Sequence, residues 1–92
     1  MDSLPKSAKP IGPQNWMSRI SDSKGKWVGI VEWHLDPQGK YCGGFVPFRG
    51  FAGTGHAHRW DVLSEEPLTL SPSLKCNTCG NHGYIREGRW TT

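Results

Sequence analysis

Two cysteines near the C-terminal end form the clearest chemical signal in the chain. Cys76 and Cys79 stand three residues apart, and Gly80 follows them directly. Two thiolates at this spacing on a tight turn can bind one metal ion, and Gly80 permits the left-handed residue that such a turn often needs. The motif therefore predicts a structural zinc knuckle. A thioredoxin-like redox pair is the weaker interpretation, because no helix is expected to begin inside the motif, and two unrelated free thiols are the remaining one.

A structural zinc ion takes four ligands, so two more must come from elsewhere in the chain. His82 needs little loop closure because it follows the knuckle closely, although it could instead hydrogen-bond the knuckle backbone. Cys42 offers a strong thiolate ligand, with a small buried side chain as its alternative role. His58 shares a predicted strand face with Trp60 and could reach across to the knuckle. The predicted metal ligands are Cys76, Cys79, His82, His58 and Cys42.

The two other histidines are weaker candidates as ligands. For His34 and His56 an exposed or hydrogen-bonded strand position is the favoured interpretation. A closed four-ligand site would add folding free energy directly, whereas a catalytic zinc would keep an open position for water and need an acid or base nearby. The sequence contains neither His-x-Glu nor His-Glu-x-x-His. We therefore expect one structural zinc ion and no enzymatic activity.

Alternation of apolar and polar residues predicts the strands that must position these ligands. The 12 glycines and seven prolines disfavour long helices. The predicted fold is mainly β, a small antiparallel sheet of about five short strands with a zinc knuckle. The predicted segments are a strand at 27–34, a turn at 36–39, a returning strand at 40–48, a strand at 56–63, a short extended piece at 68–70 and a hairpin at 83–90.

Length and composition indicate one small domain preceded by an arm. With 92 residues and 35% hydrophobic content, the chain has a thin core that a bound metal would help to stabilise. Residues 1–15 are rich in proline and lysine and poor in large apolar groups, which predicts a flexible basic arm. Residues 16–92 are the predicted β domain, entered through one amphipathic turn that contains Trp16, Met17 and Ile20.

The formal charge of +3 is concentrated at the N-terminal end. Residues 1–26 hold five of the 11 Lys and Arg residues but only two of the eight acidic ones, which leaves the rest of the chain neutral. A neutral body argues against a broad nucleic-acid surface. A nucleic-acid-binding zinc module stays the alternative, because the basic arm could contact phosphates while a tryptophan stacks on a base. The cations concerned are Lys6, Lys9, Arg19, Lys24 and Lys26.

Neither a membrane nor an export pathway is indicated. No apolar run approaches the roughly 18 residues that a membrane helix needs, and the first residues lack the apolar stretch of a signal peptide. An odd cysteine count with a Cys-x-x-Cys pair is typical of a reducing compartment. We therefore expect a cytoplasmic protein that does not associate with membranes.

Five tryptophans are many for so small a domain. Trp27, Trp33 and Trp60 have the strand spacing of core residues. Trp16 and Trp90 flank the ends of the predicted sheet, where they either close it or remain exposed as anchors for a partner, since large rigid aromatics carry much of the energy of protein interfaces. We predict these two as the partner-binding residues.

Four segments carry a resemblance to known proteins: Gly43–Phe48, His58–Trp60, Pro67–Leu74 and Cys76–Trp90. Together they resemble a family of small proteins encoded by bacteriophages of actinobacteria. The resemblance covers about residues 27–90, and the stretch from Leu70-Ser-Pro-Ser to Cys79-Gly is its most specific part. It implies an intracellular phage product in the cytoplasm of the bacterial host, and it carries no activity over to this chain. We therefore expect a zinc-stabilised binding module that modulates or inhibits a host protein.

Overall fold

The computed structural model describes residues 3–53 and 58–92, and this part of the chain is built from short strands without a helix. A four-stranded antiparallel sheet has the order β1-β2-β3-β4. The predicted fold class, mainly β with short antiparallel strands, is confirmed. The strands of this sheet are β1 (Lys9–Gly12), β2 (Asn15–Ser21), β3 (Trp27–Leu35) and β4 (Tyr41–Pro47).

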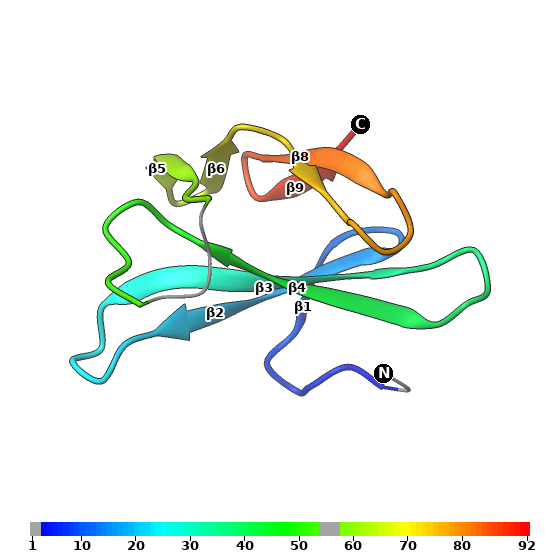
Figure 1. Cartoon of the computed structure of the whole chain (residues 1–92), viewed down its shortest axis with the longest axis horizontal. Coiled ribbons are helices and arrows are strands. Elements are labelled where there is room, and N and C mark those ends of the chain that lie inside the picture. Colours follow the sequence, from blue (N-terminus) through cyan, green and yellow to red (C-terminus); the bar gives the residue numbers. More distant parts are fainter. Residues whose placement is uncertain (1–2, 54–57) are drawn as a thin grey trace.

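Two smaller antiparallel sheets lie over one face of the four-stranded sheet (Figure 1). The described residues form nine strands, whereas the sequence predicted about five. The difference arises because several strands are only two to four residues long and give a weak signal in the sequence. None of the described elements is a helix with the length and hydropathy needed to cross a bilayer. The small sheets consist of β5 (Asp61–Glu65) with β6 (Leu68–Ser71), and of β7 (Leu74–Lys75), β8 (His82–Arg86) and β9 (Arg89–Thr91).

The core lies between the two layers. Ile30 of β3 is fully buried and pairs with Val46 of β4, while Ile85 of β8 is buried from the opposite layer. Because side chains alternate along a strand, the core face of β3 also carries Glu32 and His34. A polar pair is therefore buried on the same face as the apolar core.

The turn between β3 and β4 forms where the sequence predicts it. The Asp36 carboxylate accepts hydrogen bonds from the backbone N–H groups of Gln38 and Lys40, each at 2.8 Å. Gly39 has a φ of 81°, a conformation that glycine adopts without steric cost. This tight connection fixes the register of β3 and β4.

The ordered sheet begins earlier than the sequence predicts. Within the segment expected to be a flexible arm, Lys9–Gly12 forms β1 and pairs with β2, and Ile11 is buried in the core. Proline is tolerated here because β1 is an edge strand, which needs fewer backbone donors. The segment with Trp16 and Met17 is a strand and not the amphipathic turn that we expected.

The strand predicted at 56–63 is shorter in the structure. β5 begins at Asp61, and Trp60 forms an isolated parallel bridge with Phe48. His56 lies outside the described residues. The side chains of Trp27 and Trp60 are half-buried against the core, and Trp33 is buried, in line with their predicted role.

We predict that truncating either fully buried isoleucine destabilises the domain strongly. Ile30→Ala and Ile85→Ala each leave a cavity between the layers, and each should lower the free energy of unfolding by about 2–5 kcal/mol in urea denaturation at constant metal concentration. Leu63→Ala is the control, because Leu63 is 66% exposed and its truncation should cost less than about 0.5 kcal/mol. Similar losses in all three variants would contradict this description of the core.

Candidate metal centre

The Cys76–Cys79 segment forms the tight turn that the sequence predicts. The backbone N–H of Cys76 donates to the carbonyl of Asn81 at 2.8 Å, and that of Gly80 donates to the carbonyl of Cys76 at 2.9 Å. Gly80 has a φ of 79°, as expected for a left-handed glycine closing the turn. The turn connects β7 to β8, whose pairing places Leu74 opposite Gly83.

Four possible metal ligands converge on this turn. The ligand atoms of His34, Cys42, Cys76 and Cys79 all lie within 4.8 Å of one another. In a tetrahedral zinc site with Zn–S bonds of about 2.3 Å, neighbouring sulfurs are about 3.8 Å apart. The cluster therefore has the size and the donor set of a four-coordinate metal site.

The β3–β4 hairpin supplies two of the four side chains. His34 and Cys42 are direct cross-strand partners, so both project from the same face of the sheet. That face is turned toward the layer that contains the knuckle, and the Nε2 atom of His34 lies 3.1 Å from the Sγ atom of Cys79. The site thus lies between the four-stranded sheet and the three-stranded sheet formed by β7, β8 and β9.

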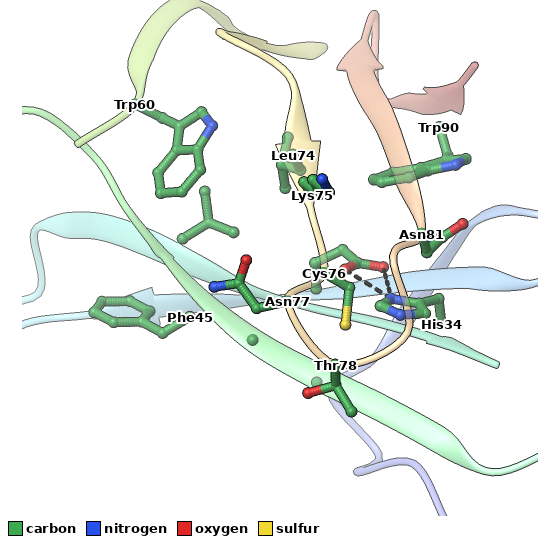
Figure 2. A pocket seen from close by; sticks show the side chains of 14 residues that line it. His34, Phe45, Trp60, Leu74, Lys75, Cys76, Asn77, Thr78, Asn81 and Trp90 are labelled. Carbon is green, nitrogen blue, oxygen red and sulfur yellow. Dashed lines mark hydrogen bonds and ion pairs between the residues drawn. The ribbon is translucent and has the colours of Figure 1, made fainter. Parts of the chain in front are cut away.

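The His34 ring is held by a buried carboxylate. Both carboxylate oxygens of Glu32 lie 3.0 Å from Nδ1 of His34 (dashed lines in Figure 2). The side-chain amide of Asn15 donates to Glu32 at 3.4 Å. Burial raises the pKa of Glu32, while the charge and hydrogen bond of His34 and the hydrogen bond from Asn15 oppose the rise. Metal-binding histidines commonly donate their second ring N–H to such a carboxylate, which fixes the tautomer and leaves the other nitrogen free for the metal.

The thiols of Cys76 and Cys42 differ in their acidity. Burial would raise the pKa of Cys76, but hydrogen bonds from the backbone N–H groups of Cys79 and Thr78 and from side chains of the cluster outweigh it and lower the pKa to about 7. Burial, a hydrogen bond with Cys79 and the negative charges of Cys79 and Cys76 raise the pKa of Cys42 to about 11. Thiolates this close repel one another, and a divalent cation between them would remove that repulsion.

Two predicted ligands lie elsewhere. Nε2 of His82 is 2.7 Å from the hydroxyl oxygen of Ser73, and the His58 ring packs edge-on against Trp60 with 4.2 Å between centroids. His82 is the first residue of β8 and pairs with the exposed Lys75, so its side chain lies on the outer face of that small sheet. The structure therefore brings Cys42, Cys76 and Cys79 together but neither His82 nor His58.

His34 is the ligand candidate that sequence reasoning ranked too low. Two features of the sequence point to it. Period-two alternation places it on the face of Ile30 with an acidic residue two positions earlier, and a turn at 36–39 sets Cys42 opposite it. A histidine that shares a core face with a carboxylate and faces a cysteine is a stronger candidate than its position in a strand alone indicates.

The two tryptophans expected to anchor a partner are both half-buried. Trp16 packs edge-on against Tyr41, with ring centroids 5.5 Å apart, and Trp90 packs against the core. Both rings therefore pack within the domain. Their role in binding a partner stays a prediction.

No protein-family model, curated protein or solved structure matches this chain. The resemblance to actinobacterial phage proteins accordingly stays a prediction. The function must be argued from the geometry of the chain itself.

We predict that His34, and not His82, contributes to metal affinity. His34→Ala should weaken Co²⁺ binding by more than about 100-fold. The reason is that losing a ligand weakens metal binding more than losing a residue that only hydrogen-bonds a ligand, which costs about 10–100-fold. His82→Ala should leave the affinity within about twofold of the unchanged chain. Co²⁺ absorption in competition with a chelator measures both constants under reducing conditions. A larger loss in His82→Ala than in His34→Ala would contradict the assignment.

We also predict a role for Glu32 in positioning His34. Glu32→Gln keeps the size of the side chain but removes the charged acceptor of the Nδ1–H bond, and it should weaken Co²⁺ binding by about 10–100-fold. Glu65→Gln, at an exposed position of β5, is the matched control. Equal affinities of the two variants would show that Glu32 does not orient the ligand.

Proposed function

We propose that the four-residue cluster binds one structural Zn²⁺ ion and that the chain is a zinc-stabilised binding module acting on another protein. The observation that carries the proposal is the convergence of three sulfurs and one imidazole nitrogen within 4.8 Å. Thiolate and imidazole donors in a four-coordinate site favour zinc over the harder Mg²⁺ and Ca²⁺ ions.

A structural role for the ion follows from the number and origin of its ligands. Four protein donors complete a tetrahedral zinc site and leave no position for a catalytic water. Two donors come from the β3–β4 hairpin and two from the knuckle, so the ion would cross-link the layers of a domain with a small core. Zinc binding in such domains contributes directly to folding.

The expected partner is a protein. If the resemblance to phage proteins holds, it is a protein of the bacterial host that the module modulates or inhibits. The neutral charge of residues 27–92 and the pairing of one N-terminal cation support a protein over nucleic acid. Arg19, one of the cations that would contact phosphates, instead pairs with Glu66 at 3.2 Å and lies 4.1 Å from the ring centroid of Trp27. A phosphate would have to displace both contacts.

Metal removal tests the structural role. Native mass spectrometry of the reduced chain should show one zinc ion, and a chelator should abolish both that mass and the cooperative thermal transition, because the ion links the two layers. The same chelator presaturated with zinc is the control. Absence of zinc would overturn the proposal. Loss of zinc with an unchanged melting temperature would also overturn it and would point to a labile, non-structural site.

A further inference from the structure

The sulfur atoms of the metal cluster are more accessible than its imidazole. His34 is 3% exposed, whereas all three cysteines are half-buried. Cys76 lines a pocket of about 300 Å³ beside β4 (Figure 2), and Cys79 lines a second pocket of about 310 Å³ next to Asp36. Either pocket has room for a molecule little larger than water, such as hydrogen peroxide. Cys42 lines neither of them, so a small molecule in these pockets meets the two thiols of the knuckle.

Cys76 and Cys79 lie at the two ends of one closed turn. The turn is held by the hydrogen bond from the backbone N–H of Gly80 to the carbonyl of Cys76, and the two sulfur atoms lie within 4.8 Å of each other. A four-residue turn keeps its terminal Cα atoms less than about 7 Å apart, and a disulfide joins Cα atoms about 4.4–6.8 Å apart. The turn therefore presents the two thiols at a separation that a disulfide can close.

Cys42 is the less favourable partner for either knuckle thiol. It belongs to β4 in the opposite layer, so its sulfur stays near the knuckle only while the two layers remain together. Oxidation of one knuckle thiol removes a ligand of the ion that holds the layers in this arrangement. The other knuckle thiol stays beside the oxidised one in any case, because the closed turn connects the two. Closing this short loop also costs less chain entropy than closing the long loop to Cys42.

A disulfide between Cys76 and Cys79 would remove both ligands that the knuckle contributes. The two remaining ligands, His34 and Cys42, both belong to the β3–β4 hairpin. Two protein donors do not complete a structural zinc site, and an ion bound to them alone would no longer connect the two layers. The layers would then be held together by the apolar core alone. Oxidation of one pair of thiols thus acts on the whole domain.

We propose that Cys76 and Cys79 are a peroxide-sensitive pair whose oxidation to a disulfide releases the structural zinc ion. This inference rests on the proposed zinc site and assigns its regulation. One thiolate first attacks an oxygen of hydrogen peroxide, so that an S–O bond forms, the O–O bond breaks and hydroxide leaves. The second thiolate then attacks the sulfenic sulfur, which forms the S–S bond, breaks the S–O bond and releases a second hydroxide. The two thiolates lose two electrons, and these reduce one peroxide molecule to two hydroxide ions.

Tryptic digestion of the oxidised chain distinguishes this disulfide from one that involves Cys42. Trypsin cleaves after lysine and arginine, which places both knuckle cysteines in peptide 76–86 and Cys42 in peptide 41–49. The full zinc-loaded chain is treated with hydrogen peroxide in the absence of reductant, its remaining thiols are alkylated, and the peptides are analysed by mass spectrometry. We expect peptide 76–86 to be two hydrogens lighter and unalkylated, while Cys42 is alkylated in its own peptide.

A chromogenic chelator measures the zinc released in the same reaction. One zinc ion should be released for each disulfide formed, and a dithiol reductant should restore both the peptide mass and zinc binding. The chain with chelator but without peroxide is the control, and it should retain its zinc over the same time. Cys79→His keeps a possible zinc ligand in the knuckle but removes the disulfide partner of Cys76, so peroxide should release its zinc at least about tenfold more slowly.

Four results would overturn the inference. These are retention of zinc in excess peroxide, a disulfide that links peptide 41–49 to peptide 76–86, zinc release through a sulfinic acid that reductant does not reverse, and equally fast release from a zinc-loaded Cys79→His chain. The first three use the unchanged chain and therefore decide even if Cys79→His does not bind zinc. Zinc content before oxidation distinguishes the two proposals. A chain with one zinc ion that fails these tests rejects only the peroxide-sensitive pair, whereas a chain without zinc rejects the structural metal.

Discussion

The contact between the His34 imidazole and the Cys79 sulfur is the interaction on which the arrangement of the two layers depends. Its two atoms are 3.1 Å apart although the residues are separated by 45 positions in the chain. Around it the β3–β4 hairpin and the knuckle bring their ligand atoms together. In a domain whose core is small, a metal bound at this position would restrain the two layers in addition to the apolar core between them.

The same contact explains why charged and polar groups are buried on the core face of the large sheet. Glu32 and His34 are 6% and 3% exposed, and burying such groups is costly unless each has a partner. Asn15 of β2, His34 of β3 and Cys42 of β4 form one row across the sheet, and Glu32 lies in the adjacent row. Hydrogen bonds lead from the Glu32 carboxylate through the His34 imidazole to the Cys79 sulfur, so the polar groups satisfy one another and are directed at one point.

Two consecutive glycines in β4 give its two faces different roles. Gly43 allows the Trp33 indole to lie against the strand, and Gly44 leaves the core face open beside the metal cluster. A larger residue at the first position would clash with a buried ring, whereas the second position has free space.

The sequence by itself determined the local structure. The Cys-x-x-Cys-Gly turn, the Asp36–Gly39 connection and the alternating strands on either side of it each follow from interactions between residues close in the chain. Only the tertiary structure decided which side chains complete the cluster. His82 is near the cysteines in sequence, but strand alternation directs it to the outer face, whereas His34 is distant in sequence and faces the knuckle because one layer packs on the other. Likewise, Lys9–Gly12 becomes a strand because Ile11 finds a buried place against residues far along the chain. Ligand sets and strand pairing of this kind depend on which faces meet, and no local pattern specifies that.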